Sequence, residues 1–382
     1  MKITALRTFV VPPRWLFLKI ETDEGVSGWG EPVLEGHAET LAAKIGEYAT
    51  FLVGRDPARI GDIWQTLYRN GCYRDGPVLM SAISGIDMAL WDIQGKVLDR
   101  PVHALLGGRV RDRIRTYTWI GGDTADTLIE DAHRARADGY AAAKFNVAGA
   151  LPMIASHAEV DAIVGRIGAL RDAVGPGFDL AVDFHGRASV AMAKVLLKEL
   201  EPLRPIFVED PVLPGQIAAM ADLARNTSIP LACGERLHAM AAFREVFERR
   251  AAGIVNPDTA HVGGITAMVR IGAWAEACDV ALAPHCPLGP IAFAACLQVD
   301  AVCHNAVLQE HASSIHYNGD IGHGTYVAGG AGAAQRDGFV AIPDGAGLGV
   351  EVDETTVVEK AAEGHAWRAP VWRHADSSIA EW

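Results

Sequence analysis

The chain has 382 residues, of which 50% are hydrophobic and 21% are charged, and its formal net charge is −13. This balance supports large buried cores and excludes an intrinsically disordered chain. The length exceeds one ordinary domain and fits a barrel of roughly 250 residues with a smaller second domain. The acidic excess argues against a nucleic-acid partner, because binding a phosphate backbone requires clustered lysine and arginine.

The beginning of the chain shows no targeting signal. Residues 1–7 lack a long apolar core and a small-residue cleavage site. No run in the sequence approaches the roughly 18 apolar residues of a membrane-spanning helix. We therefore expect a cytoplasmic protein that has no membrane partner.

Residues 1–115 have the pattern of an α+β domain. Two β-prone runs within 17–31 flank the sequence DEG at 23–25, a turn signal that predicts a hairpin. From about residue 36 to residue 99 the apolar residues recur at helical spacing, most clearly in 79–93. We expect a small sheet followed by helices in this domain.

Residues 116–320 have the pattern of an α/β barrel of the modified TIM type. Short apolar runs alternate there with helical stretches, and eight such runs are the number that closes a parallel barrel. The last six runs end at acids or histidines whose residue numbers differ, by subtraction, by 23 to 27, close to one strand, one helix and two loops. The eight runs end near Trp119, at Lys144 to Asn146, and at Asp183, Glu209, Glu235, Asp258, His285 and Glu310.

Residues 321–382 form the remainder of the chain. The sequence is rich in glycine and alanine at 323–334 and then passes into a tail that is rich in tryptophan. The simplest interpretation is a flexible connection followed by a segment that returns to pack on the first domain.

Three acidic residues are candidates for a metal site. Asp183, Glu209 and Glu235 end three successive strands, so their side chains are expected to converge on one pocket. Three hard oxygen donors suit Mg²⁺ or Mn²⁺, and without a cation the carboxylates would repel one another. The alternative is neutralisation by Arg187 and Arg236, which are close in sequence.

Two histidines are candidates for acid and base catalysis. His285 and Asp258 end neighbouring runs, and a carboxylate beside an imidazole fixes its tautomer and raises its basicity. His185 lies two residues beyond Asp183 and is expected to point inward from the same side of a pleated strand. A single inward histidine is more often structural, but a histidine with an aspartate on the adjacent strand end favours a catalytic pair.

The pattern suggests abstraction of a proton next to a carboxylate, with the resulting anion held by positive charge. Lys144 can add to that charge, unless it is exposed to solvent. Glu310 can hydrogen-bond a carboxylate oxygen if it carries a proton. Asn146 cannot act as a base, whereas a racemase needs a base on each face of the carbon. Dehydration needs one base and one acid, which His285 and His185 can supply.

These residues resemble the mandelate racemase branch of the enolase superfamily, and within it the D-galactonate dehydratases. The segments DFHGR at 183–187 and APHCPLGP at 283–290 are the most specific. The resemblance extends over the whole chain and includes residues 12–15, 17–25, 80–83 and 380–382.

The resemblance implies a capping domain built from both ends of the chain over a barrel, and an even-numbered homo-oligomer. It implies one Mg²⁺ per subunit on the three carboxylates, with Mn²⁺ as a substitute. His285 would be the base with Asp258 behind it, His185 the acid, and Glu310 the stabiliser of the enediolate. The substrate would be a sugar acid, D-galactonate, and the product 2-dehydro-3-deoxy-D-galactonate.

Two departures from the family pattern bear on the substrate. Asp210 stands where the family more often has a second glutamate, and the segment 147–157 near the barrel mouth is unlike that of galactonate enzymes. Specificity is expected to come from polar turns of the capping domain and from the second barrel strand, or else these residues are plain surface. The substrate-binding candidates are Arg14, Trp15, Tyr73, Arg74 and Asn146.

Other functions stay open from the sequence. The enzyme could dehydrate another aldonic or aldaric acid, or it could be a racemase or epimerase of the same superfamily. A metal-dependent hydrolase usually has His-x-His on an early strand, whereas residues 117–120 read YTWI. A non-catalytic sugar-acid-binding protein would have no use for the Asp258 and His285 pair.

Overall fold

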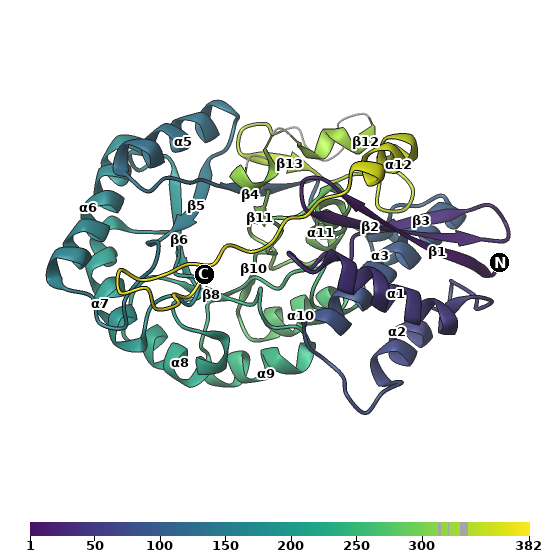
Figure 1. Cartoon of the computed structure of the whole chain (residues 1–382), viewed down its shortest axis with the longest axis horizontal. Coiled ribbons are helices and arrows are strands. Elements are labelled where there is room, and N and C mark those ends of the chain that lie inside the picture. The colour runs from purple at the N-terminus through teal and green to yellow at the C-terminus, as the bar shows by residue number, and fades with distance from the viewer. Residues whose placement is uncertain (312–314, 320, 329–334) are drawn as a thin grey trace.

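The computed structural model describes residues 1–311, 315–319, 321–328 and 335–382. A small α+β unit lies beside a larger barrel of parallel strands surrounded by helices (Figure 1). Within the described part of the chain, no helix is both long and apolar enough to span a bilayer.

The α+β unit begins with three antiparallel strands in the order β1-β2-β3. They are β1 (Ile3–Val11), β2 (Trp15–Thr22) and β3 (Ser27–Gly30). The predicted hairpin is confirmed between β2 and β3. Gly25 in its turn has φ of 79°, which glycine adopts without the steric cost that other residues meet.

The predicted helical region is also confirmed. It forms α1 (Ala38–Leu52), α2 (Ile60–Arg69) and α3 (Pro77–Leu98), which share one apolar core with the sheet. Helix α3 approaches β3 so closely that a Cβ atom on Gly30 would collide with the carbonyl oxygen of Gly85. Two glycines therefore allow the longest helix of the unit to lie directly on its sheet.

Eight parallel strands form the barrel, as predicted. Their order is β10-β9-β8-β7-β6-β5-β4-β11, and backbone hydrogen bonds from Leu282 of β10 to Asn305 and Val307, just before β11, join the two ends. The strands are β4 (Arg113–Trp119), β5 (Ala142–Asn146), β6 (Asp179–Asp183), β7 (Phe207–Glu209), β8 (Leu231–Cys233), β9 (Ile254–Val255), β10 (Ala281–Leu282) and β11 (Gln309–Glu310).

Helices surround the barrel and follow its strands in sequence (Figure 1). Thr124 and Ser156 cap two of them by accepting the backbone N–H three residues later. After α4 (Val102–Leu105), the helices are α5 (Ala125–Ala137), α6 (His157–Val174), α7 (Val190–Leu200), α8 (Ile217–Arg225), α9 (Met240–Arg249), α10 (Gly264–Ala277) and α11 (Pro290–Val302). Short 3₁₀ turns occur at Glu201–Leu203, Pro214–Gln216, His316–Asn318 and His323–Thr325.

The end of the chain contacts both units. Strand β12 (Val327–Ala328) pairs with β14 (Glu351–Val352), and β13 (Phe339–Ala341) adds an antiparallel strand beside β4. Helix α12 (Glu354–Glu363) then lies on the α+β unit, where Glu354 pairs with Lys19 of β2 at 2.7 Å. The glycine- and alanine-rich stretch at 323–334 lies partly outside the described residues.

The expectation that Trp15 lies on a polar turn is wrong. Trp15 is the first residue of β2, and its side chain is completely buried. Its ring packs against those of Phe17, His323 and Tyr326. The ring therefore joins the first unit to the end of the chain, and it has no surface left for a substrate.

We expect Trp15→Ala to lower the free energy of unfolding by about 3–5 kcal/mol, because it leaves a large cavity in a packed core. Chemical denaturation would measure the change. The matched control is Tyr73→Ala, whose side chain is 93% exposed and whose loss should change stability by less than about 0.5 kcal/mol. Unchanged stability in Trp15→Ala together with a raised KM would contradict the core assignment.

Candidate active site

The three candidate metal ligands lie together at one end of the barrel. Asp183 ends β6 and Glu209 ends β7, and their Cα atoms are direct partners in the parallel sheet. Glu235 lies two residues beyond the end of β8, the next strand. All three side chains are buried. Adjacent parallel strands thus bring them to one edge, as their regular spacing indicates.

Each of these carboxylates already contacts a hydrogen-bond donor. Both oxygens of Glu209 accept hydrogen bonds from Nζ of Lys144 at 3.0 Å. Glu235 lies 3.0 Å from Nε2 of His285, and Asp183 accepts the backbone N–H of His185 at 2.7 Å. In the ranges that the structure describes, no three His, Cys, Asp or Glu side chains form a ready-made metal cluster. A cation would have to replace some of these contacts.

The chemistry of the donor set nevertheless fits a divalent cation. Burial raises the pKa of Glu209 well above its usual range, and repulsion from Asp183 and Glu235 adds to this in spite of the nearby Lys144. One ammonium group therefore does not neutralise three buried carboxylates. Oxygen donors alone are the ligands that Mg²⁺ prefers in proteins. Asp183, Glu209 and Glu235 are the residues that would hold it.

The main ion pair of Arg236 is with Asp210, which is not one of the three candidate metal ligands. Arg236 donates to the carboxylate of Asp210 from Nε at 3.0 Å and from Nη2 at 2.6 Å, and its Nε lies farther from Glu235, at 3.6 Å. Burial raises the pKa of Asp210 to about 6 even though Arg236 opposes the shift. Arg187 donates to the carbonyl of Ala148 at 2.8 Å. The aspartate at position 210 is therefore held beside the site by its own arginine.

Lys144 ends up inside the site, so the solvent-exposed alternative is wrong. The side chain is 2% exposed, and Nζ lies between Glu209 at 3.0 Å and Glu310 at 3.2 Å. Burial alone would lower the pKa of Lys144, but these two carboxylates raise it well above its usual value. Glu310 also accepts the backbone N–H of Cys286 at 3.0 Å. Lys144 and the backbone N–H of Cys286 both act as donors toward Glu310, whereas the role expected from the sequence requires Glu310 itself to donate.

His285 and Asp258 form the expected pair. Asp258 Oδ2 lies 2.7 Å from Nδ1 of His285, and its other oxygen accepts the backbone N–H of Ala260 at 2.6 Å. Burial would lower the pKa of His285, but Glu235, Glu310 and Asp258 raise it well above its usual value. Because Asp258 accepts the proton on Nδ1, Nε2 is the nitrogen that faces the other carboxylates.

His185 reaches the site by a different route from the one expected. Strand β6 ends at Asp183, and His185 lies in the turn that follows, with φ of 51°. Such a backbone conformation is uncommon for a residue other than glycine, and it occurs often at functional sites. Nε2 of His185 lies 3.5 Å from Glu235. The argument from strand alternation was wrong, although the ring does lie beside the candidate ligands.

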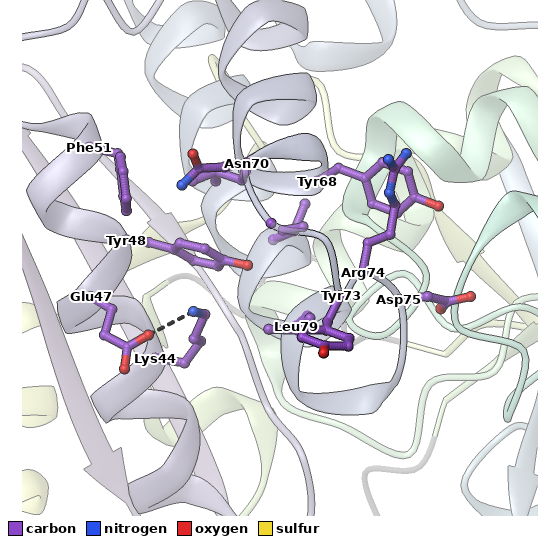
Figure 2. Close-up of a pocket in the computed structure, with 13 residues that line it drawn as sticks. Lys44, Glu47, Tyr48, Phe51, Tyr68, Asn70, Tyr73, Arg74, Asp75 and Leu79 are labelled. Carbon is purple, nitrogen blue, oxygen red and sulfur yellow. Dashed lines mark hydrogen bonds and ion pairs between the residues drawn. The ribbon is translucent and has the colours of Figure 1, made fainter.

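The candidate substrate residues of the α+β unit lie in two places. Arg14 is buried and donates to Glu35 at 3.0 Å and to the carbonyl of Pro287 at 2.7 Å. Tyr73 and Arg74 line a cavity of about 240 Å³ between α1 and the loop that joins α2 to α3 (Figure 2). This loop also approaches the barrel. Burial lowers the pKa of His238, which follows β8, and the carboxylate of Asp75 in the loop is close enough to oppose this shift.

Asn146 faces a larger cavity at the barrel end. This cavity has a volume of about 720 Å³ and is lined by Trp119 and Asn146, which end β4 and β5, by residues that follow these strands, and by Pro370 and Trp372 from the end of the chain. Asn146 is the direct Cα partner of Asp183 in the sheet. The cavity therefore lies on the side of the candidate ligands where β4 and β5 end.

Sequence reasoning missed two groups near these residues and gave Arg236 a different partner. Tyr117 is buried on β4, and the charges of Glu310 and Lys144 act on its hydroxyl group. Arg236 holds Asp210, as described above. The carbonyl oxygen of Trp382 lies 2.6 Å from Nδ1 of His185. The tryptophan-rich character of the tail was the one signal in the sequence that could have directed attention to this last contact.

Comparison with known families gives matches to both units. The model "Enolase C-terminal domain-like" matches residues 127–356, and the model "Mandelate racemase / muconate lactonizing enzyme, N-terminal domain" matches residues 4–107. Together these two matches cover most of the α+β unit and of the barrel.

Similar proteins include curated D-galactonate dehydratases and solved structures of the enolase superfamily. The D-galactonate dehydratases of Ralstonia pickettii (strain 12J) and Xanthomonas euvesicatoria pv. vesicatoria (strain 85-10) are each 53% identical over 382 residues, which is 100% of both chains. An enolase from Agrobacterium radiobacter with bound Na and L-malate has a TM-score of 0.90 at 30% identity over 100% of both chains. A mandelate racemase/muconate lactonizing enzyme from Sulfitobacter sp. has a TM-score of 0.89 at 31% identity, covering 98% of this chain and 99% of that one.

Proposed function

Because the chain belongs to the mandelate racemase/muconate lactonizing enzyme family of the enolase superfamily and is a sugar-acid dehydratase, we propose that it converts D-galactonate to 2-dehydro-3-deoxy-D-galactonate. The full-length relatives at 53% identity that carry this activity in their names support the choice of substrate. The reaction removes a proton from C2 and the hydroxyl group from C3 of the sugar acid.

One observation carries the assignment of residues, namely that two imidazoles approach the same carboxylate. Nε2 of His285 lies 3.0 Å from Glu235, and Nε2 of His185 lies 3.5 Å from its other oxygen. A sugar acid bound at this carboxylate would have one imidazole for the C2 proton and another for the C3 hydroxyl. We assign His285 as the base and His185 as the acid.

The C2 proton passes to Nε2 of His285. A dication held by Asp183, Glu209 and Glu235 would supply positive charge for the anion that forms when this proton leaves. Nε2 of His285 faces Glu235 at 3.0 Å, so this nitrogen lies on the side of the ring where the C2 proton would be taken up. Asp258 remains on Nδ1 and holds the ring in place.

Loss of the hydroxyl group completes the dehydration. The electron pair that loss of the C2 proton leaves in the anion then forms a C2=C3 double bond as the C3–O bond breaks, and the oxygen leaves as water with a proton from Nε2 of His185. The resulting enol then gives up its hydroxyl proton at C2 and gains a proton at C3 to become the 2-keto acid. Lys144, held between Glu209 and Glu310, supplies a fixed positive charge to the carboxylate end of the substrate.

We expect a kcat/KM for D-galactonate at least about 100-fold above that for its C4 epimer D-gluconate, since a site that binds a hydroxyl group discriminates against its displacement. A panel of aldonic and aldaric acids, with the 2-keto-3-deoxy product followed by NMR, would measure this. Preference for another acid of the panel would overturn the substrate but keep the reaction. Exchange or inversion at C2 without loss of water would favour the racemase alternative.

A further inference from the structure

The final segment of the chain, residues 364–382, crosses the barrel end that carries the candidate catalytic groups. It leaves α12 on the α+β unit and runs across to the barrel strands (Figure 1). On its way the ring of Trp367 lies 5.5 Å from the guanidinium of Arg14, and the ring of Trp372 lies 4.4 Å from that of Arg187. The segment therefore contacts both units as it passes over the site.

A turn then brings the end of this segment back toward the site. The backbone N–H of Ala380 donates to the carbonyl of Trp372 at 3.0 Å, and that of His374 donates to the carbonyl of Ser378 at 2.9 Å. These two hydrogen bonds hold 372–380 as a closed loop. This loop places Trp382, two residues beyond its end, beside the site.

Trp382 contacts the candidate acid with both its backbone and its ring. Its carbonyl oxygen lies 2.6 Å from Nδ1 of His185, and the two rings meet edge to face with centroids 5.8 Å apart. This backbone oxygen belongs to the last residue of the printed sequence, and it accepts a hydrogen bond both as a carbonyl and as part of an ionised carboxylate, so Nδ1 of His185 is the donor in this contact. The indole Nε1 of Trp382 is buried and has no hydrogen-bond partner among the described residues.

The contact completes a set of restraints on His185. Its backbone N–H donates to Asp183 at 2.7 Å, and its φ of 51° is an uncommon value that the surroundings must maintain. Without Trp382 the backbone of His185 would remain fixed, but its ring would be free to rotate. With Trp382 in place, Nε2 faces Glu235 at 3.5 Å.

We propose that Trp382 is a positioning residue for the dehydration step: its backbone oxygen and its ring fix the orientation of the His185 imidazole, so that Nε2 faces the departing hydroxyl group. This role rests on the proposed function of His185 as the acid. It links the orientation of the candidate acid to a residue that is 197 positions away in sequence. The contact at Nδ1 can hold the His185 ring in the same orientation before and after Nε2 gives up its proton.

The test separates the two halves of the reaction in the full-length enzyme. In D₂O, removal of the C2 proton by His285 places deuterium at C2 of recovered D-galactonate whenever the intermediate returns to substrate, whereas keto-acid release also requires His185. We expect a chain that ends at Glu381 to lose at least about 100-fold in kcat for dehydration, the usual contribution of general acid catalysis. KM should change by less than about threefold, and deuterium should now accumulate at C2 of the substrate.

Two substitutions and a matched control sharpen this test. Trp382→Phe keeps the backbone oxygen and an aromatic edge, and its kcat should be within about fivefold of that of the parent enzyme. Trp382→Ala keeps the backbone oxygen but loses the ring that holds it in place. Its kcat should lie between that of the shortened chain and that of Trp382→Phe. Val371→Ala changes an exposed side chain of the same segment and should leave kcat, KM and the exchange rate unchanged.

A kcat within about threefold of the parent in the shortened chain would overturn the proposal. So would a parallel loss of exchange and dehydration in a folded variant, because a merely structural role would affect both steps alike. If the shortened chain does not fold, Trp382→Ala takes its place in the test. That variant must then show continued C2 exchange together with reduced keto-acid release. Failure of the proposed function is distinguishable, because the parent enzyme itself would then release no keto acid from any sugar acid.

Discussion

His285→Asn is expected to reduce dehydration of D-galactonate by at least about 1,000-fold in kcat, within the range that general base catalysis contributes. The loss corresponds to about 4 kcal/mol at 1.36 kcal/mol per factor of ten. Asparagine can still donate to Asp258 but cannot take a proton from C2. Exchange of the C2 proton with D₂O should therefore disappear together with keto-acid formation. Steady-state kinetics and NMR of the recovered substrate would measure both.

The companion variant His185→Asn should behave differently. It removes the acid but leaves His285, so keto-acid release should fall while C2 exchange continues. His304→Asn, on a side chain that is 81% exposed, serves as the control and should leave both rates unchanged. Turnover of His285→Asn at the parent rate would remove His285 from the role of base. Persistent C2 exchange in that variant would require another base on the same face.

The barrel and the position of its candidate ligands were predictable because parallel strands end at one edge. The eight apolar runs predicted the number of strands, and the regular spacing of Asp183, Glu209 and Glu235 indicated the end at which their side chains meet. The exact strand ends were less predictable. Glu235 and His285 lie two and three residues beyond their short strands, yet the loops still hold them at the same edge.

The partners of these side chains could not be predicted, since they depend on contacts between distant parts of the chain. His185 reaches Glu235 because a turn follows β6, and nothing in the local alternation of residues indicates the φ of 51°. Glu310 contacts two donors, the side chain of Lys144 and the backbone N–H of Cys286, and a count of acids and bases in the sequence does not predict these partners. The contact of Trp382 with His185 arises only after the chain has passed through the barrel and the α+β unit and returned.

Trp15 shows a different limit of the sequence. Its neighbours Pro12 to Arg14 indicated a polar turn, and the tryptophan was placed with them. The residues that follow, at 15–20, are almost continuously apolar, which is typical of a strand buried on both faces. Strand β2 is indeed the central strand of its sheet, with β1 and β3 on either side. Giving more weight to this run would have placed Trp15 in the core.

Removal of divalent cations by EDTA is expected to reduce dehydration by more than about 100-fold, and Mg²⁺ should restore it, with Mn²⁺ as a working substitute. The intermediate that follows loss of the C2 proton carries additional negative charge, and a bound dication contributes several kcal/mol to holding it. Isothermal titration calorimetry should give one Mg²⁺ per subunit. Glu235→Gln should weaken Mg²⁺ binding and dehydration together, while Asp222→Asn on the exposed surface of α8 should change neither.

Binding of Mg²⁺ should also stabilise the fold, because a ligand that binds only the folded state adds RT ln(1 + [L]/Kd). At a concentration 100 times Kd this is about 2.7 kcal/mol, which a rise in the unfolding midpoint would report independently of activity. The carboxylates now in contact with Lys144, His285 and the backbone would exchange part of those contacts for the cation. Full activity after removal of all divalent cations would show that Lys144 and the histidines suffice, and the metal assignment would then be wrong.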